Sequence, residues 1–395
     1  MTQDHNNTFC VLPWIHLYVG TDGNVLPCCQ GDRSKPLGNI NDTSISDILN
    51  SEKIIKIRQQ MILGKKSSEC ARCYQLESNG LQSERQIQNR QWAHLVNEIM
   101  SSPDTVNPPI YLDIRLNNIC NLKCRMCSGY YSSSIQQEEY EIWGKESTAF
   151  KKIQRDYAMT EVIEFMPGVD RIYFAGGEPL LSSEHYQILQ SLIDIDRTNV
   201  TLVYNTNFTS LNFKNLNVLD FWQQFKNVTV LASLDAEHKV AEYVRHGTDW
   251  GVIEQNINSL LAKCPHVTLK IASAVGFMNV TSLISLQQRW HNQGLVDINQ
   301  FYLSVMISPE HLTLQVLPDS HKERIEKEIQ NHIEWCKQHG ATNLIHEWRN
   351  AARFMKSSTG TQHLVEFNRL TAILDQHRGE SFATVFPEFE DLIDV

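Results

Sequence analysis

From residue 110 onward, short apolar runs alternate with longer stretches of mixed polarity. The runs are rich in β-branched and aromatic residues, which favour strands, and each intervening stretch is long enough for a helix. The six runs cover residues 110–116, 171–175, 200–204, 228–233, 267–275 and 301–306. Strands that alternate with helices are typical of parallel βαβ units. We therefore expect an α/β domain whose units form an open, partial (β/α)6 barrel rather than a closed barrel of eight.

The first 80 residues show a different pattern. Apolar runs at 16–19 and 25–26 flank an Asp-Gly turn, which is typical of a β-hairpin. Ser44 and Asp47 have the spacing of a helix-capping pair, and a second helix is expected over 52–63, before a glycine. These signals predict a small α+β module ahead of the barrel.

Two further regions complete the chain. Residues 81–108 are polar and rich in Gln and Arg, which indicates a helix and a linker that ends at a Pro-Pro pair. Beyond residue 309, apolar positions recur at helical spacing, and the apolar, acidic tail 382–395 is expected to pack back on the body. We predict an N-terminal domain over 1–90, a core barrel over 91–308 and a helical C-terminal region over 309–395.

Composition narrows the class of protein. The chain has 395 residues, of which 42% are hydrophobic and 20% are charged, as in ordinary globular domains. No apolar run approaches the roughly 18 residues of a membrane-spanning helix, and the polar start has no signal-peptide pattern. We therefore expect a cytoplasmic protein. The net charge of −10 argues against non-specific binding to nucleic acid.

Cysteine is the most informative residue type. Eight of the ten cysteines precede residue 128, and clustered cysteines in a reducing compartment favour metal ligation over disulfides. Cys264 and Cys336 stand alone and are expected to be buried, inert thiols.

Cys120, Cys124 and Cys127 lie in a loop directly after the first predicted barrel strand. Three thiolates at this spacing can ligate three irons of a [4Fe–4S] cluster, which leaves the fourth iron open. The alternative is a zinc site, but zinc usually takes four ligands and the loop offers no fourth.

This Cys-x3-Cys-x2-Cys spacing resembles the signature of the radical S-adenosylmethionine (SAM) superfamily. The resemblance implies that the open iron binds SAM through its methionyl amine and carboxylate. It also implies that electron transfer cleaves SAM to a 5′-deoxyadenosyl radical, which abstracts hydrogen from an unactivated carbon.

Other motifs follow in the order of that family. Gly176, Gly177, Glu178 and Pro179 look like the Gly-Gly-Glu-Pro motif that binds the methionyl ammonium. Glycines allow the backbone to approach a ligand closely, and a carboxylate pairs with an ammonium.

Four weaker matches concern single residues. Asn207 resembles the asparagine of a Thr-Asn-Gly motif, with Phe208 in place of the glycine. By resemblance, Ser233 lies near the SAM ribose, Arg245 meets the SAM carboxylate and Met126 packs on adenine. Strand-end capping, a surface ion pair and ordinary core packing are the alternatives for these side chains.

A second set of cysteines precedes the barrel. Cys10, Cys28, Cys70 and Cys73 resemble the ligands of a twitch domain, the one-cluster relative of the SPASM domain. The family normally places this module after the barrel, whereas here it comes first. Four ligands would saturate a second, auxiliary [4Fe–4S] cluster, whereas three would leave an iron that could bind substrate directly. A structural zinc site is also compatible. Cys28 fits the spacing better than Cys29, which we interpret as a packed neighbour.

The resemblance implies a radical SAM enzyme that oxidises, epimerises or forms a bond in a peptide or a small natural-product or sugar-like substrate. A flavodoxin or ferredoxin would donate electrons, and Lys123 and Arg125 either meet that donor or are solvated. The aromatic segment 130–143 is interpreted as a helix that packs its rings on the barrel, or else as a lining of the active-site mouth. The contrasting hypothesis is a non-catalytic iron–sulfur redox sensor or electron carrier.

Overall fold

The computed structural model describes residues 7–78, 82–105, 107–115, 117–144 and 155–393. The chain divides into two compact units. The first unit comprises Met1–Ile119, Thr148–Tyr204 and Asp220–Val228, and the second comprises Cys120–Ser147, Asn205–Leu219 and Thr229–Val395. Across the described ranges, no helix combines the length and apolarity that crossing a bilayer requires.

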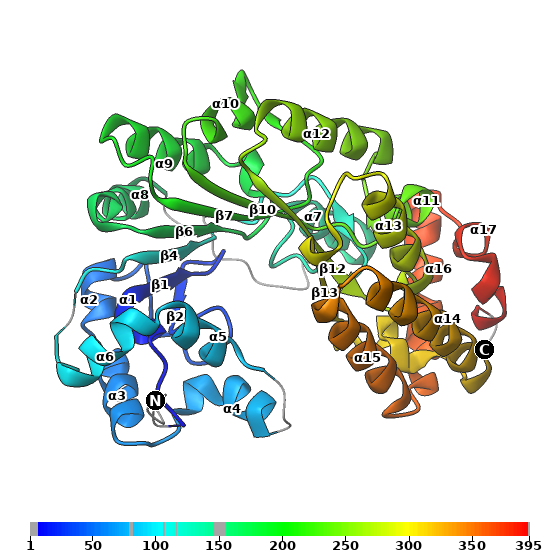
Figure 1. The fold of residues 1–395 in the computed structure, drawn as a ribbon, viewed down its shortest axis with the longest axis horizontal. Coiled ribbons are helices and arrows are strands. Elements are labelled where there is room, and N and C mark those ends of the chain that lie inside the picture. The colour runs from blue at the N-terminus through cyan, green and yellow to red at the C-terminus, as the bar shows by residue number, and fades with distance from the viewer. Residues whose placement is uncertain (1–6, 79–81, 106, 116, 145–154, 394–395) are drawn as a thin grey trace. The chain divides into compact units, whose positions relative to one another are not determined.

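The sheet of the first unit joins the N-terminal hairpin to the barrel strands. Its order is β3 (Gly38–Asn39), β2 (Asn24–Leu26), β1 (His16–Val19), β4 (Tyr111–Ile114), β6 (Arg171–Phe174) and β7 (Thr201–Thr206). The predicted hairpin is confirmed, since β1 and β2 pair antiparallel. Strand β1 also pairs parallel with β4, with Leu17 opposite Leu112 (Figure 1). The N-terminal module therefore extends the parallel sheet, which the hydrophobic pattern did not predict.

The helices of this unit include the two that the sequence predicts, one after Ser44 and one over 52–63. They are α1 (Leu12–Ile15), α2 (Ile45–Leu49), α3 (Glu52–Ile62), α4 (Ala71–Ser78), α5 (Glu84–Gln91), α6 (Ala93–Ser101), α8 (Arg155–Glu164) and α9 (Ser183–Asp194). Asp47 N donates to Ser44 Oγ at 3.0 Å, so the expected cap of α2 is confirmed. The one helix expected within 81–108 is two, because the backbone at Trp92 leaves helical geometry between α5 and α6.

The second unit carries the remaining barrel strands. β10 (Asn227–Ala232), β12 (Thr268–Val275) and β13 (Phe301–Val305) run parallel in that order. Two short ribbons pair β5 (Lys123–Cys124) with β11 (Arg245–His246), and β8 (Asn212–Phe213) with β9 (Leu216–Asn217). The connecting helices are α7 (Ser133–Trp143), α10 (Val218–Trp222), α11 (His238–Val244), α12 (Trp250–Lys263) and α13 (Val280–Asn292). All six predicted barrel strands are thus present.

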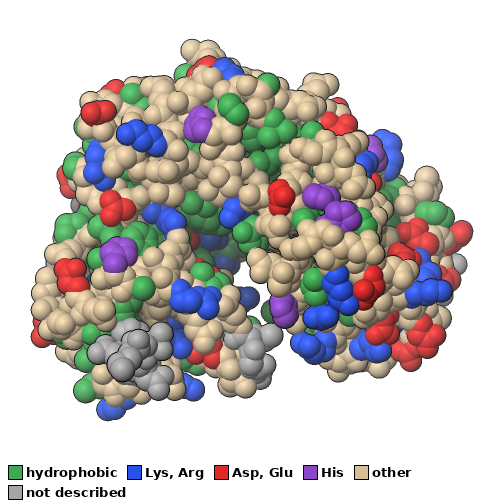
Figure 2. Space-filling model, viewed as in Figure 1, with side chains coloured by type: hydrophobic (Ala, Val, Ile, Leu, Met, Phe, Trp, Pro, Cys, Tyr) green, Lys and Arg blue, Asp and Glu red, His purple; other side chains and the backbone are tan. Residues whose placement is uncertain are grey.

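The C-terminal region is helical, as expected. It contains α14 (Asp319–Gln338), α15 (Thr342–Lys356), α16 (Leu364–Arg378) and α17 (Phe382–Val385). The tail buries its apolar side chains, with Phe386 and Phe389 both 0% exposed. Its acidic residues Glu388, Glu390 and Asp391 stay at the surface, and Figure 2 shows acidic side chains gathered at this C-terminal end. The predicted boundaries at 90 and 308 stay a prediction.

Candidate functional site

The loop with the predicted cluster cysteines lies at the start of the second unit. Cys124 belongs to β5, which pairs with β11 so that Arg245 lies opposite Cys124. Cys124 is buried, whereas Cys120 and Cys127 are half-buried, and all three are free thiols. Burial, and then the nearby Cys124 thiol, raise the pKa of the Cys127 thiol to about 11. The loop therefore holds at least Cys124 and Cys127 close enough to interact.

Arg245 connects the cysteine loop to the end of β10. Its Nε donates to Asp235 Oδ2 at 2.7 Å, and its Nη1 lies 3.7 Å from Cys124 Sγ. Burial opposes the charge of Arg245, but the Asp235 carboxylate raises the pKa of the guanidinium overall. Burial also raises the pKa of the Cys124 thiol, and Arg245 acts in the opposite direction. The arginine is thus a fixed cation against one of the predicted ligands.

Asn207 contacts a second cysteine of the same loop. Its Nδ2 donates to Asn121 Oδ1 at 2.9 Å and lies 3.8 Å from Cys120 Sγ. The next residue, Phe208, has a φ of +59° and is fully buried. The left-handed backbone that glycine would favour is therefore retained here by a phenylalanine.

Ser233 and Met126 complete the predicted SAM contacts in this unit, and Asp235 lies two residues beyond Ser233. Ser233 is half-buried, and its N donates to Thr206 O at 2.8 Å. Asp235 is 1% exposed, and its Oδ1 also accepts from Ala274 N at 2.8 Å. Sequence reasoning did not assign Asp235 to the site. Met126 is half-buried within the loop.

The Gly-Gly-Glu-Pro segment belongs to the first unit, where it packs on the residues that precede Cys120. A Cβ on Gly177 would lie 2.2 Å from Ile119 O, and Glu178 N donates to the same oxygen at 2.6 Å. Gly176 has a φ of +124°, which strains any other residue. Glu178 is 2% exposed and its Oε1 accepts from Leu180 N at 3.1 Å. Pro179 begins the 3₁₀ turn Pro179–Leu181.

The predicted auxiliary ligands also belong to the first unit. Burial raises the pKa of the Cys10 thiol, and the thiols of Cys70 and Cys73 raise it further. Burial likewise raises the pKa of Cys28, with contributions from Cys29, Cys10 and Cys70. These mutual effects place the four predicted ligands near one another.

Cys29 has a different environment from the four predicted ligands. Burial is the main cause that raises the pKa of its thiol to about 12, and the carboxylates of Asp113 and Glu84 also raise it. Cys29 therefore differs from the four predicted ligands in its acidic neighbours, although its thiol also raises the pKa of Cys28. Within the described ranges, no three Cys, His, Asp or Glu side chains converge as they do around a single metal ion.

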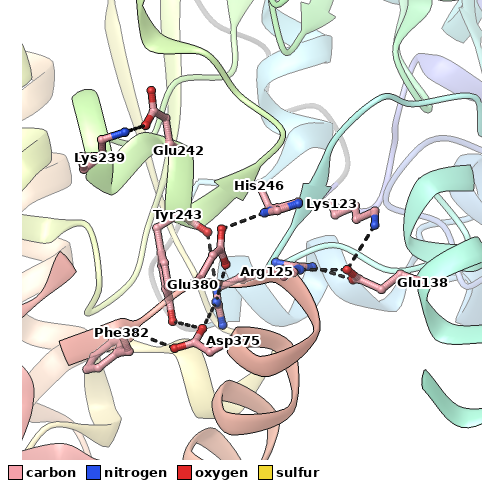
Figure 3. A network of polar contacts seen from close by, with 11 residues as sticks. Lys123, Arg125, Glu138, Lys239, Glu242, Tyr243, His246, Asp375, Glu380 and Phe382 are labelled. Carbon is pink, nitrogen blue, oxygen red and sulfur yellow. Dashed lines mark hydrogen bonds and ion pairs between the residues drawn. The ribbon is translucent and has the colours of Figure 1, made fainter. Parts of the chain in front are cut away.

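The structure corrects the interpretation of Arg125 as a residue that faces solvent or an electron donor. Its side chain is 3% exposed, and Nη2 donates to Asp375 Oδ1 at 2.5 Å and to Glu380 Oε2 at 2.9 Å. The guanidinium also lies 3.7 Å above the Tyr243 ring. Figure 3 shows Arg125 pointing to these two carboxylates, near the end of α16. The carboxylates lie far away in the sequence, so no local pattern marked the ion pair.

Lys123, the other basic residue of the loop, is partly exposed. Its Nζ lies 3.4 Å from Glu138 Oε1, and Glu138 also pairs with Arg378 of α16 at 2.7 Å. Glu138 of α7, together with carboxylates at and just after the C-terminal end of α16, thus holds both basic residues that flank Cys124 (Figure 3).

The favoured interpretation of the aromatic helix is also wrong for two of its residues. Tyr140 is 58% exposed and Trp143 is 41% exposed, so these rings do not pack on the barrel. Trp143 instead lines a cavity of about 200 Å³ together with Cys124, Cys127 and Leu374. The alternative, a helix that borders the cysteine loop, fits the structure better.

Comparisons with known families match two parts of the chain. Residues 10–74 match the model of SPASM, described as an iron–sulfur cluster-binding domain. Residues 114–273 match the model of the radical SAM superfamily. No curated protein sequence matches the chain.

Several solved structures are similar to parts of the chain. Hexahistidine-tagged anSMEcpe with bound AdoMet is 17% identical over 59% of this chain and 60% of that chain, with a TM-score of 0.43. Streptococcus suis SuiB bound to S-adenosylmethionine is 14% identical over 63% of this chain and 50% of that chain, with a TM-score of 0.37. SuiB bound to precursor peptide SuiA is 12% identical over 70% and 62%, with a TM-score of 0.39. The chain thus spans less than two thirds of the length of each of these structures.

Proposed function

Since the chain is a radical SAM enzyme with an SPASM iron–sulfur domain ahead of its core, we propose that Cys120, Cys124 and Cys127 hold the [4Fe–4S] cluster that binds SAM. The domain order and the α/β fold, with its partial barrel and helical C-terminal region, agree with the expectations from sequence. Three thiolates ligate three irons and leave one iron for SAM. When bound, the cluster and SAM supply a 5′-deoxyadenosyl radical that abstracts hydrogen from the substrate.

One observation carries this assignment. Two residues that were predicted to contact SAM lie against sulfurs of the cysteine loop, Asn207 beside Cys120 and Arg245 beside Cys124. N–H donors near a thiolate stabilise its charge, and groups that contact metal ligands in this way orient them. Arg245 is held in turn by Asp235, so we add Asp235 as a positioning residue.

The remaining SAM contacts are proposed from the resemblance together with local geometry. We assign the methionyl ammonium to Glu178 and to the backbone of Gly176 and Gly177, with Pro179 holding the turn. Met126 and Ser233 are assigned to the adenosine portion. The close approach of Gly177 to Ile119 supports this assignment, because Ile119 directly precedes Cys120.

SPASM domains bind auxiliary iron–sulfur clusters, and we propose that Cys10, Cys28, Cys70 and Cys73 hold a second [4Fe–4S] cluster. Their thiols influence one another, whereas the pKa of Cys29 responds to the carboxylates of Asp113 and Glu84, although Cys29 also contributes to the raised pKa of Cys28. Complete ligation by four thiolates leaves no iron for substrate. The second cluster is therefore assigned to electron acceptance.

This arrangement suits a two-electron change of the substrate. Hydrogen abstraction removes one electron and one proton from a carbon, and the auxiliary cluster would accept the second electron. We propose oxidation or bond formation by this route, or epimerisation, in which the substrate radical regains a hydrogen atom and passes no net electron to the cluster. The substrate is a peptide or a small natural-product or sugar-like molecule, with a flavodoxin or ferredoxin as electron donor.

The test is anaerobic reconstitution with iron, sulfide, SAM and dithionite, followed by measurement of 5′-deoxyadenosine. We expect the wild-type chain to produce it and the Cys124→Ala variant to produce none. Cys264→Ala is the matched control, because Cys264 is a buried cysteine outside both predicted sites. A Cys124→Ala variant as active as Cys264→Ala would overturn the assignment.

A further inference from the structure

The first unit contains a cavity that none of the cluster or SAM assignments uses. It has a volume of about 440 Å³ and lies beside α3, where apolar side chains that include Trp14, Ile55, Ile62 and Leu63 line it. This volume is within the range of about 300–1,000 Å³ that is typical of small-molecule sites. Leu63 is 67% exposed and Ile55 is 41% exposed, so an apolar surface is open to a ligand.

A buried arginine lines the same cavity. Arg58 is 5% exposed, and its Nε donates to Pro13 O at 2.9 Å. Its Nη1 is buried and has no hydrogen-bond partner among the described residues. Burial lowers the pKa of Arg58 to about 10, and no carboxylate among the described residues opposes that effect.

Arg85 of the same unit shows the hydrogen-bond and ion-pair partners that a buried arginine normally has. It is 8% exposed, yet its Nη2 donates to Glu77 Oε2 at 2.6 Å and its Nη1 donates to Phe9 O at 2.8 Å. A buried cation without such partners is costly, because desolvation is not offset by an opposite charge. The guanidinium of Arg58 thus has no anionic partner among the described residues, and the cavity that Arg58 lines has room for one.

Asp104 does not supply that anion. It lines the cavity but is exposed at the surface, and within the described residues it forms no ion pair with Arg58. The cavity thus combines an apolar wall with a buried, uncompensated guanidinium.

We propose that this cavity is a binding site for the carboxylate of a ligand with an apolar body, with Arg58 as its anchor. Guanidinium pairs with a carboxylate through charge-assisted hydrogen bonds, and Trp14, Ile55 and Leu63 cover the apolar part. The carboxylate belongs either to a free apolar acid or to the C-terminal residue of a peptide. The site is independent of the cluster assignments, since none of its residues is a predicted ligand.

Calorimetry on the full chain tests the proposal with octanoate, with octanol as its uncharged counterpart. We expect octanoate to bind about 10- to 100-fold more tightly than octanol, the effect of one charge-assisted hydrogen bond. N-acetyl-leucine and N-acetyl-leucinamide form the peptide arm. Tighter binding of N-acetyl-leucine than of octanoate would indicate that the ligand is a peptide C-terminus. Tighter binding of octanoate would indicate a free apolar acid. Equal binding of octanoate and octanol, or no binding of any carboxylate, would overturn the proposal.

Two sets of variants separate a ligand anchor from a structural arginine. Arg58→Met should abolish the preference for octanoate and should raise the unfolding temperature of the ligand-free chain, because it removes a buried unpaired charge. A purely structural role through Pro13 predicts a lower unfolding temperature instead.

Leu63→Asp and Leu63→Asn form a matched pair at an exposed position of the cavity, where neither change threatens folding. The aspartate should weaken octanoate binding relative to the asparagine, because it adds a like charge near the carboxylate. The site would be excluded if the two Leu63 variants bound octanoate with the same affinity and Arg58→Met bound octanoate as tightly as the wild type.

Discussion

At the residue scale, Arg245 is the side chain that best tests how the loop is organised. One guanidinium reaches both the Asp235 carboxylate and the Cys124 sulfur, which a single lysine ammonium cannot do with the same geometry. Arg245→Lys should therefore weaken SAM binding by about 10- to 100-fold. The measurement is the SAM concentration dependence of 5′-deoxyadenosine formation. Arg369→Lys, which alters an exposed pair with Glu366, is the control and should leave that dependence unchanged.

Phe208 gives a prediction about stability. Phe208→Ala should lower the free energy of unfolding by about 3–5 kcal/mol, because it empties a fully buried site. Phe208→Gly removes even more of the side chain but relieves the left-handed backbone, which costs a non-glycine residue about 1–2 kcal/mol. The glycine variant should therefore be the more stable of the two in urea unfolding. If the alanine variant is the more stable, the positive φ at residue 208 does not destabilise a non-glycine residue there.

The sequence revealed individual residues only where the motif itself is local. The spacing of Cys120, Cys124 and Cys127 is visible in one loop, and resemblance pointed to Asn207 and Arg245. The role of Asp235 in holding Arg245, and the burial of Arg125, could not be read in this way. Arg125 meets Asp375 across 250 residues of sequence, and only the folded chain brings such partners together.

At the element scale, the Gly-Gly-Glu-Pro turn depends on the absence of a side chain. Gly177→Ala would place a Cβ 2.2 Å from Ile119 O, so the turn or the segment before Cys120 must move. A displacement of about 1 Å at a reactive site can cost about 100-fold in rate, and we expect a loss of this order in 5′-deoxyadenosine formation. The matched control is Gly168→Ala, where a Cβ meets nothing within 4 Å. Equal activities of the two variants would contradict the close approach.

Strand positions were more predictable than strand partners. The β-branched runs marked all six barrel strands to within a few residues, because that composition is a local property. The parallel pairing of β1 with β4 joins residues about a hundred positions apart and has no local signal. The start of α2 was predictable because Ser44 and Asp47 form a local capping signal. The break at Trp92 was not predictable, because no glycine or proline marks that position.

At the scale of the whole molecule, Glu347 makes stability depend on pH. Burial raises its pKa from the usual value near 4.5 to about 7, although Leu303 N donates to its Oε2 at 2.8 Å. The folded chain therefore holds this proton more tightly than the unfolded chain, and stability falls as pH rises from about 4.5 to about 7.

Glu347→Gln should remove that loss, since the amide oxygen can still accept from Leu303 N. We expect the variant to exceed the wild type by about 1–3 kcal/mol at pH 8 and to show a smaller difference at pH 5. Urea unfolding of the metal-free chain at both pH values measures this. A variant that is less stable than the wild type at pH 8 would show that the carboxylate is not penalised by burial.

The two predicted cysteine sets lie in different compact units, the auxiliary set in the first and the SAM-binding set in the second. Removal of one set should therefore leave the other able to bind its own cluster. The order of the two family matches along the chain, SPASM before radical SAM, was predictable because each match rests on local cysteine spacing.

The most direct test of the two-cluster account is the iron content of the anaerobically reconstituted chain. We predict about eight irons in the wild type, and about four both in the triple alanine variant at Cys120, Cys124 and Cys127 and in the quadruple alanine variant at Cys10, Cys28, Cys70 and Cys73. Zinc in place of iron, or a quadruple variant that retains the full wild-type iron content, would contradict the account.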